Sequence, residues 1–462
     1  MVADVAQRST TLPHPPRRLP LLGDVVGAHA ATPVQDSVAL AARLGPIFER
    51  VVLGRRYILV SGADLAGELC DEDRFVKHVS PAIEGLRSIG GDGLFTAHTH
   101  EPNWQKAHDL LRPAFAQSAM RSYHSIMLDV ASDLMTHWHS HKTVDVSSDM
   151  TKLTLDTIGR TGFSYTFDSF TRDKPHPFVD AMVGVLSHNQ RRALVPIPWL
   201  ADVVFRKADR RNAENQRYLA EVLDSIVRTR RDSGMSGEGD LLDIMLDAAR
   251  DSQNPNALSE VNIRQQILTF LIAGHETTSG ALSFALYYLA QNPEVLAAAR
   301  AEVDEVWGSQ PPTFEQVPKL RYVRRVLDET LRLWPTAPAF AREAREDTRI
   351  GGSHEMKKGD WAFVLIPGLH RDPVWGDNPD AFDPDRFLSA NVRARPGHVY
   401  KPWGTGERAC IGRQFAIHEA VLVLGKILQQ FDFHAEPSYE LKIEERLTLM
   451  PKGFRLALSA RN

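Results

Sequence analysis

The sequence predicts a mainly helical protein with a smaller β-rich region. The strongest helical signal is Val261 to Leu289, a stretch that is apolar on nearly every face and therefore marks a central buried helix. Two other stretches have the pattern of strands. One is 48–60, with a turn at Gly54, and the other is 336–370, with turns at Gly351-Gly352 and Lys358-Gly359.

The remaining elements are helices and their connections. Helical patterning is expected at 63–70, 101–115, 127–138, 150–162, 177–186, 208–231 and 320–333. The apolar segment 191–200 contains two prolines, so it connects two helices, either as a lid over an apolar pocket or as a loop packed on the core. Residues 371–402 are expected to form a meandering ordered loop, and residues 447–454 a hairpin.

The domain organisation is expected to be simple. Residues 1–20 carry four prolines and form an irregular lead-in. No internal repeat and no linker divides the remainder of the chain. We therefore expect residues 21–462 to form a single domain.

Composition excludes several classes of function. A formal net charge of −4 over 462 residues argues against nucleic acid as a bulk partner. Two cysteines cannot form a disulfide framework, which fits a reducing cytoplasm. No apolar run is long enough to span a bilayer, and the start has no signal-peptide pattern, so no membrane span is expected.

One of the two cysteines, Cys410, lies in an unusual setting. It belongs to the stretch Trp403-Gly404-Thr405-Gly406-Glu407-Arg408-Ala409-Cys410-Ile411-Gly412, which precedes a long apolar segment. The pattern predicts a tight loop at the start of a buried helix, where amides and the helix N-terminus would stabilise a thiolate. A thiolate beside glycine-only backbone suits a large flat metal cofactor, although a lone cysteine is more often a small buried apolar residue.

A second motif, Ala273-Gly274-His275-Glu276-Thr277-Thr278, lies in the central helix. Glycine weakens a helix, and threonine hydroxyls compete for its carbonyl groups. Together they suggest a local opening for a small ligand and ordered water. A packing glycine beside capping threonines explains the same residues equally well.

Two pairs of residues at helical spacing add to these motifs. Glu329 and Arg332 share one face of an otherwise apolar helix, which favours a buried ion pair over a weak surface pair. Trp104 and His108 lie one helical turn apart, with further basic residues nearby.

These motifs resemble those of the cytochrome P450 family. The cysteine stretch is similar to the family's haem-binding signature Phe-x-x-Gly-x-Arg-x-Cys-x-Gly, with Trp403 in place of the phenylalanine. The resemblance implies the cytochrome P450 fold, haem b as cofactor and Cys410 as iron ligand. It also implies that Thr277 and Glu276 deliver protons during oxygen activation, and that His275 is a helix residue and not an iron ligand.

The same resemblance assigns further contacts. Arg408, Trp104 and His108 would bind the haem propionates, with Lys77 a fourth candidate that is otherwise a solvated surface lysine. Further cofactor contacts are implied at Trp403, Gly404, Gly406, Gly412, Ala273 and Gly274. Glu329, Arg332 and Arg386 would be structural residues that lock the core supporting the cysteine loop. The indole of Trp403 is expected to shift the reduction potential of the iron.

Within that family, residues of about 20–458 resemble the haem domain of the self-sufficient bacterial fatty-acid hydroxylases. Matching stretches include Gly93 to Thr96, Phe270 to Gly280 and Leu333 to Phe340. An apolar channel is implied, lined by Phe95, Ile83, Leu86, Ala273, Ala337 and Leu447, each of which core packing would also explain. Arg55 matches the arginine that anchors the substrate carboxylate, but Leu59 stands in the place of its tyrosine partner. Tyr57, on the same strand face as Arg55, could substitute.

The resemblance predicts a monooxygenase that inserts one oxygen atom of O2 into an unactivated C–H bond. The expected reaction is subterminal hydroxylation of medium- or long-chain fatty acids. A lipid-like natural product such as a polyketide or terpenoid is the alternative substrate, and a peroxide-driven peroxygenase or a haem sensor or carrier is the alternative function. No flavin domain follows within residues 1–462, so electrons are expected from a separate ferredoxin or flavodoxin and an NAD(P)H-dependent reductase. Lys401, Arg408 and Arg413 would favour such an acidic partner.

Overall fold

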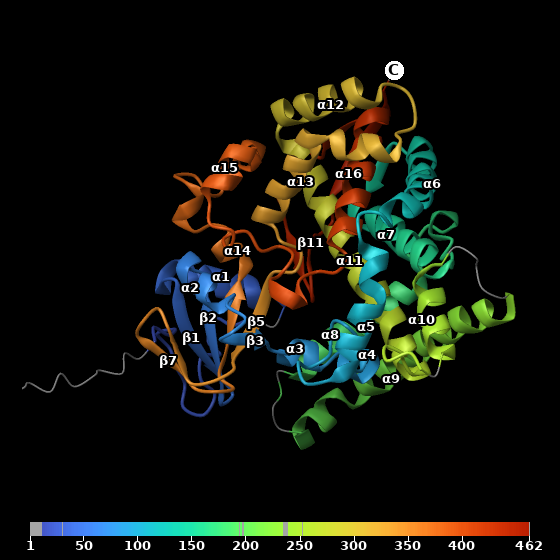
Figure 1. Ribbon diagram of the computed structural model, residues 1–462. Helices are drawn as coiled ribbons and strands as arrows, with labels where there is room; N and C mark the ends of the chain where they lie inside the picture. Colours follow the sequence, from blue (N-terminus) through green and yellow to red (C-terminus); the bar gives the residue numbers. More distant parts are fainter. Residues whose placement is uncertain are drawn as a thin grey trace, which may run out of the picture. The chain divides into compact units, whose positions relative to one another are not determined.

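The computed structural model describes residues 12–29, 31–193, 195, 198–233, 239–251 and 253–461. Their contacts divide the chain into two compact units. Unit 1 comprises the chain up to residue 78 together with 338–381 and 393–409, and unit 2 comprises 79–337, 382–392 and 410 onward (Figure 1).

Unit 1 is built on a five-stranded sheet of order β1-β2-β8-β5-β3. Strands β1 (Ile47–Val52) and β2 (Arg55–Val60) form the hairpin that the sequence predicts, with its turn at Leu53-Gly54. Strand β8 (Trp361–Leu365) runs parallel to β2, and β5 (Ala339–Ala344) pairs antiparallel with both β8 and β3 (Phe75–Lys77). A separate hairpin joins β6 (Thr348–Ile350) to β7 (His354–Met356).

Side chains alternate between the two faces of the sheet along β2, and both faces pack against apolar clusters. Ile58 and Val60 belong to one apolar cluster, and Leu59 belongs to another. The helices of unit 1 are α1 (Pro33–Leu44), α2 (Ala63–Leu69) and α14 (Ile366–Leu369).

Unit 2 is organised around α11 (Glu260–Gln291), the helix expected at 261–289. Ser259 caps its start by accepting a hydrogen bond from the Asn262 amide. Figure 1 shows α11 beside α7 (Val146–Phe163), α13 (Arg321–Leu333) and α16 (Arg413–Gln430), all of which contact it. No helix within the described ranges combines the length and apolarity that a membrane crossing needs.

Shorter elements complete the structure. The other helices of unit 2 are α3 (Pro81–Glu84), α4 (Arg87–Gly90), α5 (Pro102–Leu111), α6 (Met120–His139), α8 (Pro177–Ala193), α9 (Pro198–Ser233), α10 (Leu241–Arg250) and α12 (Pro293–Trp307). Its strands are β4 (Thr143–Asp145), β9 (Phe431–Ala435) and β12 (Arg455–Ala460) in one sheet, and β10 (Ile443–Glu445) with β11 (Leu449–Pro451) in another.

Several predicted boundaries need correction. The helix expected at 101–115 ends as an α-helix at Leu111 and continues as a 3₁₀ turn to Phe115, because Pro113 has no N–H group for the α-helical bond. The hairpin expected within 447–454 is formed by β10 and β11, and β12 instead pairs with β4 and β9. The loop expected at 371–402 includes a short helix, α15 (Ser389–Ala394).

The helix connection expected at 191–200 runs from Ala193 to Pro198, where proline occupies the first position of α9. Three of its residues, 194, 196 and 197, lie outside the described residues. The choice between a lid and a packed loop therefore stays open.

Candidate functional site

Cys410 lies immediately before α16, as the sequence predicts. Gly412 is the N-terminal capping residue of the helix, and the Arg413 amide donates a 3.4 Å hydrogen bond to the Cys410 carbonyl oxygen. The cysteine is exposed, whereas α16 is largely buried from Phe415 onward. The start of this helix therefore presents an exposed cysteine residue.

The electrostatics of Cys410 differ from the expectation. Although the residue is exposed, the protein atoms around its thiol desolvate it and raise its pKa, and the Gly412 amide and the Arg413 charge oppose that rise. The Gly412 amide at the helix start acts in the expected direction, but desolvation of the thiol outweighs it. A bound metal cation would supply the missing stabilisation, since coordination deprotonates a thiol.

The loop before Cys410, which belongs to unit 1 up to residue 409, needs its glycines. Gly404 and Gly406 have φ angles of +73° and +64°. A Cβ atom at Gly406 would also overlap the carboxylate of Glu72, which accepts a 3.0 Å hydrogen bond from the Glu407 amide. Nearby, the buried indole nitrogen Nε1 of Trp403 has no hydrogen-bond partner within the described part of the chain.

The motif of α11 forms an exposed spot on a buried helix. Ala273 is exposed and Gly274 and Thr277 are half-buried, although Ile272 and His275 beside them are buried. The Thr277 hydroxyl donates a 2.8 Å hydrogen bond to the Ala273 carbonyl oxygen, which is the expected competition for a backbone acceptor. The helix nevertheless continues through the motif, so the expected opening is not a break in the helix.

Glu276 and His275 have different surroundings within this motif. Glu276 is buried, and this burial raises the pKa of its carboxyl group against the opposing effects of Arg446 and the Thr448 hydroxyl. The His275 ring bonds to the Leu271 carbonyl oxygen and is neutral, because burial lowers its pKa to about 4. His275 is thus a packing residue of the helix, and Glu276 can hold a proton.

The four predicted propionate partners divide between the units. In unit 2 the rings of Trp104 and His108, both on α5, stack on each other with their centroids 4.9 Å apart. In unit 1 burial lowers the pKa of Lys77 to about 7, and the Arg408 charge adds to this. Lys77 is half-buried, and binding of propionates by all four residues stays a prediction.

The ion pair expected on α13 is fully buried. Arg332 donates to both carboxylate oxygens of Glu329, at 2.6 and 2.7 Å, and both side chains are 0% exposed. The Asp383 amide adds a 2.9 Å hydrogen bond, and Arg386 lies 3.6 Å from the same carboxylate. This geometry excludes the weak surface pair, and support of the cysteine loop by the three residues stays a prediction.

The predicted substrate residues differ in accessibility. In unit 2, Ala337 is exposed, Phe95, Ile83 and Leu447 are half-buried, and Leu86 is buried. The turn carrying Leu447 is held in place by a 2.9 Å hydrogen bond from the Leu449 amide to the Thr336 carbonyl oxygen.

The predicted carboxylate anchors are on β2 in unit 1. Arg55 is exposed, whereas the Tyr57 ring packs edge-on against Trp361 and joins an apolar cluster. Leu86 and Tyr57 thus have the surroundings of core residues, and a role in substrate binding stays a prediction for every member of the set.

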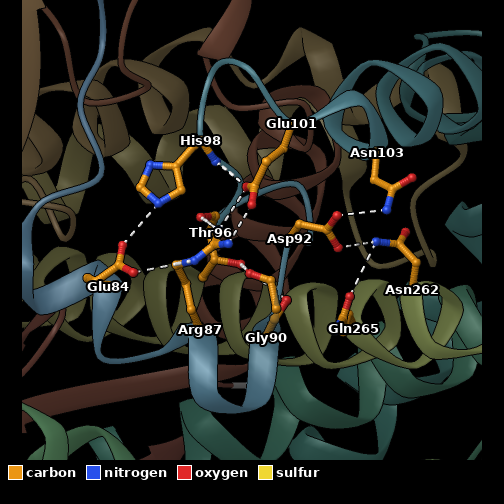
Figure 2. Close-up of polar contacts among 11 residues, drawn as sticks. Glu84, Arg87, Gly90, Asp92, Thr96, His98, Glu101, Asn103, Asn262 and Gln265 are labelled. Carbon is orange, nitrogen blue, oxygen red and sulfur yellow. Dashed lines mark hydrogen bonds and ion pairs between the residues drawn. The ribbon is translucent and has the colours of Figure 1, made fainter.

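Sequence reasoning missed several contacts. Glu72 supports the cysteine loop, and Thr448 with Arg446 faces Glu276. Figure 2 shows a further polar network around Arg87 and Asp92 that joins the segment before α5 to α11. The glycine-flanked Asp92 was the only local signal of this network.

Within unit 2, the exposed Cys410 before α16 and the exposed spot on α11 suit a cofactor with a cysteine ligand. Within unit 1, the turn before Cys410 needs glycine at positions 404 and 406. Comparison with known proteins agrees. The chain matches the family model described as "Cytochrome P450" over residues 13–458. It belongs to the cytochrome P450 family of haem-dependent monooxygenases.

Relatives cover nearly the whole chain. A bifunctional cytochrome P450/NADPH–P450 reductase of Bacillus cereus (strain ATCC 14579) is 45% identical over 463 residues, which are 98% of this chain and 43% of that protein. A second such protein, from Bacillus subtilis (strain 168), is 46% identical over 428 residues, which are 91% of this chain and 40% of that protein. A self-sufficient cytochrome P450 monooxygenase of Phanerodontia chrysosporium is 41% identical over 453 residues, or 96% and 42%. The chain thus spans about two fifths of the length of these relatives.

Proposed function

We propose that the protein hydroxylates medium- or long-chain fatty acids at subterminal carbons. The observation that carries the proposal is the exposed spot of α11, where the Thr277 hydroxyl bonds to the Ala273 carbonyl oxygen and the adjacent Glu276 carries a buried carboxyl group with a raised pKa. This spot lies in unit 2, the unit that also contains Cys410.

The cofactor contacts follow from the same residues. When bound, haem with a cysteine thiolate ligand supplies the electron density that favours O–O bond cleavage. Cys410 Sγ would be the ligand, held by the backbone turn before α16. Arg408, Lys77, Trp104 and His108 would hold the propionates through charge and N–H donors.

Two residues of α11, Glu276 and Thr277, would store and transfer protons. The raised pKa of Glu276 favours a carboxyl group that still carries its proton, and one oxygen, Oε2, has no hydrogen-bond partner within the described residues. The Thr277 hydroxyl donates to the Ala273 carbonyl oxygen, which leaves its own oxygen free to accept a hydrogen bond. We therefore propose that Glu276 stores a proton and that the Thr277 hydroxyl, which is partly exposed, relays protons on this side of the helix.

The substrate class rests on the resemblance and on partly exposed apolar side chains. Phe95, Ile83, Ala337 and Leu447 offer accessible apolar surface in unit 2, which suits an alkyl chain. In unit 1 the exposed guanidinium of Arg55 could pair with a carboxylate.

Electrons are proposed to come from a separate ferredoxin or flavodoxin and an NAD(P)H-dependent reductase. The exposed Arg413, next to the cysteine loop, supports docking of an acidic partner. The two Bacillus relatives, by contrast, are named as bifunctional cytochrome P450/NADPH–P450 reductases. Turnover of residues 1–462 with each type of donor, and with peroxide in place of a donor, tests this part.

The primary test is the carbon monoxide difference spectrum of the reduced protein, with Cys410→Ser and, as matched control, Cys70→Ser. We expect the thiolate-type Soret band in wild type and in the control, since Cys70 is the other free cysteine, and its loss in Cys410→Ser. Saturated fatty acids should shift the ferric protein from low to high spin. A thiolate band with no response to fatty acids would refute the substrate class, and no thiolate band in folded wild type would refute the whole proposal.

A further inference from the structure

A ladder of side-chain amides on α11 holds the turn that precedes Phe95. The Leu94 amide donates a 3.0 Å hydrogen bond to Gln266 Oε1. Gln266 Nε2 donates to Asn262 Oδ1 at 2.9 Å, and Asn262 Nδ2 donates to Asp92 Oδ1 at 2.7 Å. The chain of bonds therefore leaves the turn at Leu94, passes along one helix face and returns to the turn at Asp92.

The two amide side chains of the ladder are buried, and Asp92, where the ladder ends, has a further hydrogen-bond partner. Asn262 and Gln266 are 1% and 0% exposed, so a lost partner there would leave a polar group buried without a hydrogen bond. Asn103 of α5 donates a 2.7 Å hydrogen bond to the second carboxylate oxygen of Asp92 (Figure 2). The turn is thus fixed between α11 and α5.

The backbone of the turn approaches α11 as closely as a glycine allows. A Cβ atom at Gly93 would lie 2.5 Å from the Thr269 hydroxyl oxygen and 3.2 Å from the Gln265 carbonyl oxygen. At Gly91, a Cβ atom would overlap the Gln265 side chain. A side chain at either position would therefore collide with Thr269 or Gln265 of α11, and the ladder opposes displacement of the turn away from the helix.

The residue that follows Phe95, Thr96, is held by Arg87. Arg87 donates to both carboxylate oxygens of Glu101, at 2.9 and 2.6 Å, and its Nη1 also donates a 2.8 Å hydrogen bond to the Thr96 carbonyl oxygen. Phe95 therefore lies between two anchored neighbours, Leu94 and Thr96, and is itself half-buried.

The ladder and the exposed spot share one face of α11. Steps of three or four residues lead from Asn262 through Gln266 and Thr269 to Ala273 and Thr277, and such steps keep side chains on the same face of a helix. Because α11 is one continuous helix, it fixes the distance between the turn before Phe95 and the exposed spot.

We propose that Asn262 and Gln266 are positioning residues for substrate selectivity: by fixing the Gly91–Leu94 turn they set where Phe95 stands and thereby which carbon of the alkyl chain is oxidised. The inference rests on the proposed function, because it takes a fatty acid as substrate. It adds a role for buried amides that would not touch the substrate.

The test compares wild type with Gln266→Leu, which has a similar size but no acceptor for the Leu94 amide. Asp92→Asn, at a half-exposed position, removes one of the two acceptors and serves as the milder variant. Gln429→Leu is the matched control, because the hydrogen bonds of its amide to other described residues go to the Gly308 and Gln310 carbonyl oxygens and to Lys426, away from the turn.

Two readouts are needed. The first is hydrogen–deuterium exchange of the peptide spanning 90–96, which does not depend on turnover. We expect it to accelerate about fivefold in Gln266→Leu, the effect of losing one net hydrogen bond, and less in Asp92→Asn. The second is the ratio of subterminal hydroxylation products, which we expect to change by about threefold or more in Gln266→Leu.

The outcomes separate the two proposals. If wild type binds carbon monoxide with a thiolate-type band but hydroxylates no fatty acid, the proposed function fails and this inference fails with it. If wild type hydroxylates fatty acids and the product ratio of both variants stays unchanged despite faster exchange, only the inference is overturned. Should Gln266→Leu not fold, Asp92→Asn decides by the same two readouts.

Discussion

At the scale of single residues, position 406 of the cysteine loop disfavours any side chain. The position combines a φ of +64° with the close approach of Glu72, whose carboxylate bonds to the next amide. The backbone conformation therefore requires glycine, and a side chain there would in addition displace the Glu72 carboxylate from the Glu407 amide.

We predict that Gly406→Ala lowers the free energy of unfolding by about 1–3 kcal/mol, the range for a strained backbone position, and reduces haem occupancy. Thermal unfolding and the thiolate-type Soret band measure the two effects. Gly397→Ala is the control, because Gly397 has no positive φ and a Cβ atom there would have no neighbouring atom within 4 Å. Combining Gly406→Ala with Glu72→Ala should restore part of the loss, and no restoration would mean that backbone strain alone is responsible.

At the scale of elements, α16 carries a buried acid that the proposed mechanism does not use. Glu419 is 1% exposed, and burial raises the pKa of its carboxyl group from 4.5 to about 8, although the Thr157 hydroxyl of α7 opposes this shift. The folded protein keeps this proton up to about pH 8, whereas the unfolded chain loses it above about pH 4.5. The folded state binds more protons in this window, so the contribution of Glu419 to stability falls as pH rises.

We predict that Glu419→Gln removes this fall. The variant should match wild type near pH 4.5 and exceed its free energy of unfolding by a few kcal/mol at pH 8, since each pKa unit corresponds to about 1.4 kcal/mol. Denaturant titrations at several pH values measure the difference. Glu436→Gln, which removes the same charge from an exposed position, should leave the pH dependence unchanged. Equal pH slopes in wild type and Glu419→Gln would contradict the prediction.

Helices and strands with local sequence signals could be predicted, whereas contacts between distant residues could not. The all-round apolarity of α11 and the alternation of β1 and β2 are local signals, and both elements were predicted at nearly their observed bounds. The cysteine stretch and the Glu329–Arg332 spacing were likewise local. Contacts between distant residues left no such signal: Glu72 reaches Glu407 across 335 positions, and Asp92 reaches Asn262 across 170.

Some local signals were overridden by the tertiary structure. Strand β12 pairs with β4 and β9, so the hairpin is displaced towards residue 443. The helix N-terminus before α16 should favour a thiolate, but desolvation of Cys410 outweighs it. Burial is a property of the assembled protein, and residue types alone could not have given the sign of that balance.

At the scale of the whole molecule, the two units are interleaved along the chain. Unit 1 consists of three segments, and the backbone passes between the units five times, at 78/79, 337/338, 381/382, 392/393 and 409/410. Its sheet pairs β2 with β8, so forming it closes a loop that contains residues 79–337. Neither unit is a continuous stretch that could fold first from one end of the chain.

We therefore predict that the haem-loaded protein unfolds in one cooperative transition, as the expected single domain requires. The last crossing lies directly before Cys410, so loss of either unit should disturb the cysteine loop and release the haem. Far-ultraviolet circular dichroism, tryptophan fluorescence and Soret absorbance should then share one midpoint in a denaturant titration, since coincidence of probes is the criterion for two-state behaviour. The haem-free protein should unfold at a lower midpoint, because a ligand that binds only the folded state stabilises it. Two resolved transitions in the haem-loaded protein, with Soret loss following only one of them, would instead establish two units that fold independently.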